Sequence, residues 1–147
     1  MFLNRLKLTH LFTTSIVCIS LMLSACTSMD SSKRMDNISD SLNSFRKAVR
    51  WGYYDEATRY IQLKDYTQTM RDTEYLKNIR ITSYEYGQKH FSEDKNKLDV
   101  IALISFYDVN RGSVRSISEK QSWWFDEENK RWFLDGDIPD FTDISRQ

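Results

Sequence analysis

The stretch Trp123–Leu134, with the sequence WWFDEENKRWFL, decides the fold. Its two ends are aromatic and its middle, Glu127–Lys130, is polar and turn-like, which predicts a β-hairpin whose second strand is Arg131–Leu134. A tight turn at Glu128 and Asn129 pairs the strands so that alternate residues share a face of the sheet. One face then carries Trp123, Phe125, Trp132 and Leu134, and the other carries Trp124 and Phe133.

The segments before this hairpin also alternate with a period of two. A strand is expected from Ile79 to Phe91, with Gly87 as a bulge. The next strand, Leu98–Val109, is apolar on both faces, and it is therefore expected to be central. Gly112 can adopt the positive φ of a turn, and a third strand follows from Val114 to Phe125. The strands together predict a four-stranded antiparallel meander.

Upstream of the strands the apolar spacing becomes helical. Asn37 or Ser39 can cap a first helix and Gly52 can end it. A second short helix is expected near Asp55 and a third over residues 69–78, so helices precede the sheet in an α+β plan. The first helix has one apolar stripe, formed by Ile38, Leu42, Phe45, Ala48 and Val49.

The composition permits one folded domain and argues against several classes of protein. The chain has 147 residues, of which 40% are hydrophobic, and only 4 Gly and 1 Pro, unlike a collagen-like or disordered chain. Its 21 basic residues balance its 21 acidic residues, so there is no basic footprint for nucleic acid.

Residues 1–25 have the plan of a secretory signal peptide. Arg5 and Lys7 precede an apolar run, Leu11–Ala25, which is shorter than the roughly 20 residues of a membrane-spanning helix. The run ends in Leu23-Ser24-Ala25-Cys26, which resembles the lipobox of bacterial lipoproteins. The resemblance implies that the sulfur and amine of Cys26 carry acyl chains, such as palmitate, and that the protein is anchored in the membrane rather than spanning it. The alternative is an ordinary signal peptide with a coincidental cysteine.

The residues after Cys26 indicate where the protein is held. In the lipoproteins it resembles, Asp at the next position retains the chain in the inner membrane, and Thr27 therefore points to the periplasmic face of the outer membrane. Residues 26–37 are polar and aperiodic, which predicts a flexible tether before a folded domain over residues 38–147. The mature chain has no cysteine pair, so its fold must depend on its core.

The aromatic residues of the domain carry a second resemblance, to uncharacterised NTF2-like lipoproteins of Gram-negative bacteria. It covers about Phe45 to Phe141 and implies helices packed on a strongly bent sheet. The sheet would form a cone whose mouth can hold a ligand and whose outer face often pairs with a second subunit. The likeness rests on Phe45, Ala48, Arg50-Trp51, Glu56-Ala57, Ile81, Tyr84-Glu85, Gln121, Trp123, Trp132-Phe133-Leu134, Pro139 and Phe141.

Two groups of residues are candidate binding sites. The first is an aromatic rim for a ligand, in which Arg50 is available for an anion or a cation–π contact. The residues of this rim are Arg50, Trp51, Tyr53, Tyr54 and Tyr84. The alternative is that Trp51 and Tyr53 only wedge the first two helices together.

The second group is a face for a protein partner, because both faces of the sheet carry large rings and only one can fill the core. The residues of this partner face are Ile101, Leu103, Tyr107, Trp124 and Phe133. The alternative is that the chain's own termini or a curled sheet edge covers them.

Catalysis and metal binding find little support in the sequence. His90 is the one histidine of the mature chain, and it lies near a strand end without a nucleophile motif. One histidine and one acylated cysteine do not make a zinc site. Glu85 can serve a residual enzyme hypothesis, but the expectation is a protein with no catalytic residue, metal or cofactor.

The leading hypothesis is therefore a non-catalytic binding or assembly module of the cell envelope. It would act as an accessory subunit of a secretion or transport complex, or as a homodimer. The alternative is a carrier or sensor of a small ligand or lipid, which would use the mouth of the cone.

Overall fold

The computed structural model describes residues 32–64 and 74–142, and all structural statements concern these residues. The chain divides into two compact units, Met1–Asp36 and Asn37–Gln147, and the second holds the sheet and its helices. Cys26, Thr27 and the first residues of the expected tether lie outside the described residues.

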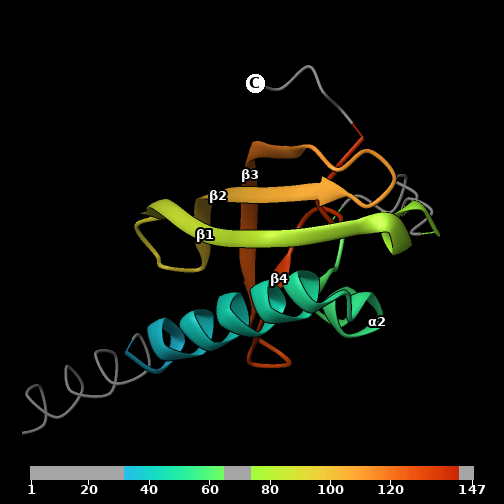
Figure 1. Cartoon of the computed structure of the whole chain (residues 1–147). Helices are drawn as coiled ribbons and strands as arrows, with labels where there is room; N and C mark the ends of the chain where they lie inside the picture. Colours follow the sequence, from blue (N-terminus) through green and yellow to red (C-terminus); the bar gives the residue numbers. More distant parts are fainter. Residues whose placement is uncertain (1–31, 65–73, 143–147) are drawn as a thin grey trace, which may run out of the picture. The chain divides into compact units, whose positions relative to one another are not determined.

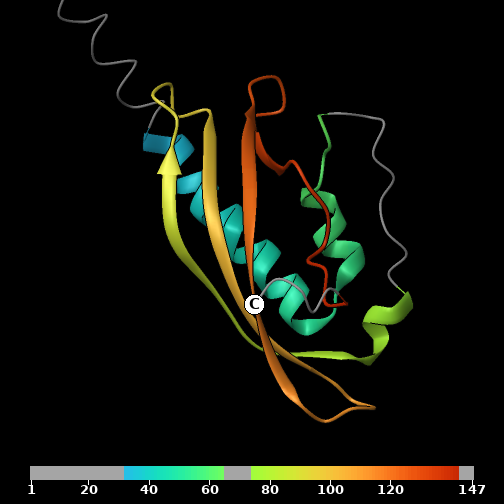
Figure 2. The same cartoon turned by 90° about the horizontal axis from the view of Figure 1, so that it is seen from above.

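The longest helix covers residues 32–51, and Figures 1 and 2 show its part from residue 37 onward along one face of the sheet. It begins earlier than predicted, so neither Asn37 nor Ser39 caps it and residues 32–37 are helical rather than a tether. Lys33, Arg34 and Met35 are good helix formers, which extend the helix beyond its apolar stripe. The predicted stripe is confirmed, and its buried members are Ile38, Leu42, Phe45, Ala48 and Val49.

Gly52 ends this helix as predicted, because its φ of 75° lies in the left-handed region. Its amide donates to the Val49 carbonyl at 3.2 Å, and the Tyr53 amide donates to the Ala48 carbonyl at 2.8 Å. This pair of hydrogen bonds is a Schellman motif, which reverses the chain at the helix end.

The remaining helical elements of the described residues are short. They are α2 (Tyr54–Ala57), η1 (Thr58–Tyr60) and η2 (Glu74–Asn78), the last two being 3₁₀ helices. The extended backbone of Ile61 ends the second helical stretch, because this residue forms a parallel bridge to Leu134. The first part of the expected third helix, residues 69–73, lies outside the described residues.

The predicted four-stranded antiparallel meander is confirmed. Its strands are β1 (Ile79–Phe91), β2 (Lys97–Asp108), β3 (Val114–Asp126) and β4 (Arg131–Leu134), in the spatial order β1-β2-β3-β4. β2 therefore has a neighbour on each side, as its apolar faces indicated. Gly112 has a φ of 70° in the turn between β2 and β3.

The sheet is not strongly curled, so the predicted strong bend is wrong. Sharp bending of a sheet needs bulges, and both irregularities lie in β1, at Ile81/Ser83 and at Tyr86/Lys89. The second of these contains the predicted bulge at Gly87. The pairing of β2 with β3 continues from Lys97–Trp124 to Tyr107–Val114 with no interruption, which keeps this part of the sheet open.

The core lies between the helix and the inner face of the sheet. Trp123 pairs with Leu134 and Phe125 with Trp132, so the four hairpin residues predicted to share a face do so and are buried. The Phe45 ring from the helix meets Trp123 edge-on, with ring centroids 5.5 Å apart. This contact fixes the helix against the sheet, and with it the position of the helix end, where the candidate site lies.

Candidate ligand-binding groove

A groove of about 1080 Å³ lies where the C-terminal end of the long helix meets the beginning of β1. Residues 50–53 at the helix end and the short helix α2 form one part of its lining. Residues of η2 and the first four residues of β1, Ile79–Thr82, form another. Of the five predicted pocket residues, the structure brings four together in this groove: Arg50, Trp51, Tyr53 and Tyr54.

Trp51 and Tyr53 stand on either side of Gly52, and both are exposed. Their exposed fractions are 65% and 55%, whereas Trp123 and Trp132 in the core are each 1% exposed. The alternative that these two residues wedge the helices together is therefore wrong. Trp51 is the last residue of the helix and does not belong to the apolar stripe that packs on the sheet, and Tyr53 follows the turn at Gly52.

Tyr54 has a different place in the groove, since it is half-buried and packs against the core. Burial raises the pKa of Tyr54 above its ordinary value, and the positive charge of Arg80 acts in the opposite direction. The phenol therefore stays neutral at physiological pH, and its hydroxyl can donate or accept a hydrogen bond.

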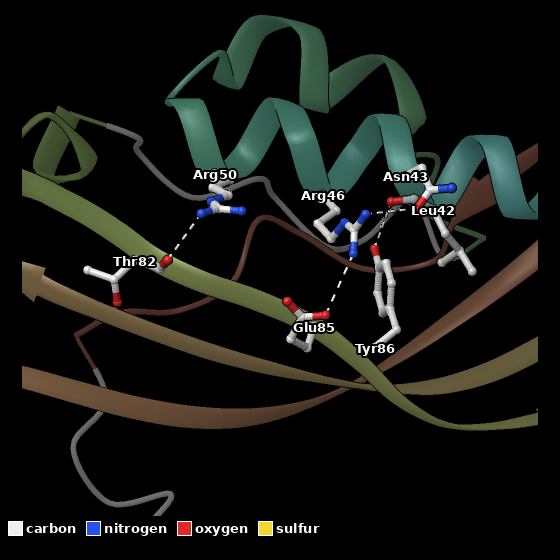
Figure 3. A network of polar contacts seen from close by, with 7 residues as sticks. All are labelled: Leu42, Asn43, Arg46, Arg50, Thr82, Glu85 and Tyr86. Atoms are coloured by element: carbon white, nitrogen blue, oxygen red, sulfur yellow. Dashed lines mark hydrogen bonds and ion pairs between the residues drawn. The ribbon is translucent and has the colours of Figure 1, made fainter.

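Arg50 is held in the groove by the edge strand of the sheet. Its Nη2 donates to the Thr82 carbonyl oxygen at 3.3 Å (Figure 3). One helical turn earlier, Arg46 approaches Glu85 of β1 at 3.8 Å, and the Tyr86 hydroxyl donates to the Leu42 carbonyl at 3.2 Å. These contacts join the helix to β1 along its unpaired edge, which also hinders pairing with a foreign strand.

Arg80 is a groove residue that the sequence analysis missed. Its Nη1 donates to the carbonyl oxygens of Lys77, at 2.7 Å, and of Ile79, at 2.9 Å. The alternation of β1 shows only that Arg80 faces away from the core. Its place in the groove depends on where the helix crosses β1, and no short-range pattern in the sequence encodes that crossing.

The other charged residues of the lining have both signs. Arg59 and Lys77 are basic, and Asp55, Glu56 and Glu74 are acidic. Lys77 forms an ion pair with Glu74 within η2. The lining is therefore of mixed charge, and it includes the exposed aromatic rings of Trp51 and Tyr53.

Tyr84, the fifth predicted pocket residue, does not line the groove. It is 1% exposed in the core, and its hydroxyl accepts a hydrogen bond from Nε2 of Gln121 at 2.9 Å. Burial strongly raises the pKa of Tyr84, and hydrogen bonds with Tyr86 and Gln121 oppose this shift only in part. Tyr84 therefore packs in the core and provides a hydrogen-bond partner for the buried side chain of Gln121.

The predicted partner face is divided by the structure. Ile101, Leu103 and Tyr107 point to the outer face of β2, where Leu103 is 49% exposed and the other two are half-buried. Tyr107 is the register partner of Arg80 and also lines the groove.

Trp124 and Phe133 are half-buried and in contact with the chain itself. Nε1 of Trp124 donates to the Gln62 carbonyl at 3.1 Å, and the Lys64 ammonium lies 5.2 Å from the Trp124 ring centroid. The Arg131 guanidinium lies 5.5 Å from the ring of Phe133. The segment that follows η1 thus covers part of this pair, whereas the alternative drawn from the sequence was cover by the chain's termini or by a curled sheet edge.

The other polar candidates lie away from the groove. His90 is exposed and pairs in register with Asp99, whose pKa is lowered by hydrogen bonds from Ser122 and Lys120. Glu85 is exposed on β1 beside Arg46. Within residues 32–64 and 74–142, no three His, Cys, Asp or Glu side chains are grouped to hold a metal ion.

No protein-family model matches the sequence, and no curated protein matches it either. In the part of the chain that the structure describes, no helix is both long enough and apolar enough to cross a membrane. The function is therefore inferred from the geometry of the groove and from the sequence.

Proposed function

We propose that the protein is a non-catalytic binding module that holds a ligand in the groove at the end of its long helix. The observation that carries the proposal is the exposure of Trp51 and Tyr53 beside a groove of about 1080 Å³, while the other tryptophans are buried or covered. Exposed aromatic rings next to a few convergent polar groups are typical of ligand sites.

The proposal includes a place in the cell. Cys26 carries the lipid that anchors the chain, and the folded domain works at the periplasmic face of the outer membrane. The domain is an NTF2-like member of the lipoproteins named above, a proposal that rests on the residues quoted for that resemblance. Replacement of Cys26 by Ser should remove the acyl mass from the intact protein and release the protein from the membrane fraction. An unchanged mass and an unchanged distribution would contradict the anchor.

Acrylamide quenching of tryptophan fluorescence tests the groove, because Trp51 is the most exposed of the four tryptophans. A dialysable extract of the cell envelope that contains the ligand should protect Trp51 from acrylamide. The protection should disappear in Trp51→Phe and in Tyr53→Ala, but persist in the matched outer-face variant Leu103→Ser. Quenching that no fraction of the extract changes would contradict the groove as a binding site.

A second function has one observation in its favour. Leu103 is 49% exposed at the middle of the outer face, with half-buried Ile101 beside it on the same strand. This supports docking of a second copy or of an envelope complex on the outer face, with the lipid fixing the location.

A further inference from the structure

Two arginines of the groove have an unusual set of partners. In residues 32–64 and 74–142, the guanidinium groups of Arg50 and Arg80 bond to backbone carbonyl oxygens and to no carboxylate. Their neighbours behave differently, since Arg46 pairs with Glu85 and Lys77 pairs with Glu74. The carbonyl contacts orient the two guanidinium groups without neutralising them, and each keeps N–H donors for an anion.

The rest of the lining limits what this anion can belong to. The groove contains four basic residues but also the acidic side chains of Asp55, Glu56 and Glu74. These carboxylates offset most of the positive charge of the lining, so it attracts a polyanion or an anionic bilayer less than a uniformly basic groove would. A ligand with one anionic group and several hydroxyl groups fits better, because carboxylate oxygens accept hydrogen bonds from hydroxyl groups.

The exposed rings indicate the shape of the ligand. Trp51 and Tyr53 present flat apolar surfaces to solvent, and the C–H face of a sugar ring can lie on such a surface and remove it from water. The lining thus offers a partner to each part of an acidic sugar: its ring, its hydroxyl groups and its charge.

We propose that the groove binds an acidic saccharide, with Arg50 and Arg80 receiving its carboxylate or phosphate and Trp51 and Tyr53 receiving its ring. This inference rests on the proposed function and names the class of ligand. The same chemical group can be presented by a soluble sugar or by the head of a glycolipid, and the experiment below separates the two sources.

The experiment is a titration of the full chain in detergent, with the quenching of Trp51 as the readout. The probes are N-acetylmuramic acid, glucose 6-phosphate and galacturonic acid, together with the neutral methyl ester of the last. At least one acidic sugar should protect Trp51, and the neutral ester should bind about tenfold more weakly, because hydrogen bonds to a charged group are the stronger ones.

Three variants assign the effect to the two arginines. Arg80→Gln should weaken binding about tenfold, and Arg50→Lys should weaken it while keeping the charge, because lysine lacks the planar fork. Arg46→Gln is the matched control, since Arg46 lies on the same helix outside the groove, and it should leave binding within about twofold. Near-ultraviolet circular dichroism checks that the buried core is unchanged in each variant.

The outcomes separate this inference from the proposed function. If the neutral ester protects Trp51 as well as the acid does, the acidic-saccharide class is overturned. It is also overturned if no acidic sugar protects Trp51 while an envelope extract still does. In both cases the groove remains the proposed binding site. Protection by mixed micelles of detergent and phosphatidylglycerol, without sugar, would also overturn the acidic-saccharide class, in favour of a lipid headgroup. Protection by mixed micelles that contain an acidic glycolipid, with none by the soluble sugars or by the phosphatidylglycerol micelles, would support the inference and identify the glycolipid as the source.

Discussion

Gly52 ends the long helix between the two exposed aromatic residues of the groove, Trp51 and Tyr53. Its φ of 75° is strained for a residue with a Cβ, although the nearest side-chain atom to a Cβ built there is 3.9 Å away. The cost of a substitution is therefore conformational rather than steric. Gly52→Ala should lower the free energy of unfolding by about 1 to 2 kcal/mol, measured by urea denaturation.

Gly112 provides the matched control for this prediction. Its φ is 70° and nothing lies within 4 Å of a Cβ built there, so Gly112→Ala should cost a similar amount. Only Gly52→Ala should also change the quenching of Trp51, because only Gly52 lies at the groove. A similar change in both variants would contradict the link between the helix end and the site.

The burial of Tyr84 predicts that the protein loses stability at alkaline pH. The pKa of Tyr84 is raised from an unfolded value of 10.0, so the native state keeps a proton that the unfolded state loses. Stability is therefore complete below pH 10 and falls as the pH rises toward the native pKa. Tyr84→Phe should reduce the fall by up to about 1.4 kcal/mol per pH unit. The free energy of unfolding is measured in urea between about pH 9 and pH 11, a range centred on the ordinary pKa of tyrosine. If it falls with pH equally steeply in both proteins, the burial of the Tyr84 phenol is contradicted.

At the scale of elements, the long helix depends on one aromatic contact with the sheet. Phe45 is fully buried against Trp123, and Phe45→Ala should lower the free energy of unfolding by about 3 to 5 kcal/mol because it leaves a cavity. Lys47→Ala, at an exposed position of the same helix, should change it by less than about 0.5 kcal/mol. Similar losses in both variants would show that the helix does not pack as described.

The strands and the end of the long helix at Gly52 were predictable from the sequence, but the beginning of that helix was not. Alternation fixes which residues of β1 to β4 face the core, so their bounds agree with the prediction to within about a residue. The helix beginning failed because Asn37 resembles a cap, while the residues before it also form helix. The extended conformation of Ile61 could not be predicted locally, because its bridge to Leu134 joins residues far apart in the chain.

At the scale of the whole molecule, the sequence located four groove residues but not the reason they form a groove. Trp51 and Trp123 are the same residue type, and only the packing of the helix makes one exposed and the other buried. The same limit applies to Trp124, whose cover by Gln62 and Lys64 follows from the path of a distant segment. The residue type predicts that a large aromatic ring must be covered by something, and the tertiary structure decides whether the core, another segment or a ligand covers it.

The outer face leads to a prediction about assembly. If a second copy or an envelope protein docks there, Leu103→Glu should abolish the complex seen by sedimentation velocity of the detergent-extracted protein, because it places a charge in an apolar contact. Val109→Glu is the matched control, since Val109 is similarly exposed, at 44%, in the turn that follows β2. A complex that persists in folded Leu103→Glu would reject the outer face as the docking surface.

Nuclear magnetic resonance of the tryptophan indole N–H groups tests most directly whether the groove at the helix end is the binding site. The chain has 4 tryptophans, and each has one indole signal that single Trp→Phe variants can assign. Titration with an acidic sugar should shift the Trp51 signal and leave those of buried Trp123 and Trp132 in place. A Trp51 signal that stays fixed throughout the titration, while the signal of Trp123, Trp124 or Trp132 moves instead, would contradict the groove as the binding site.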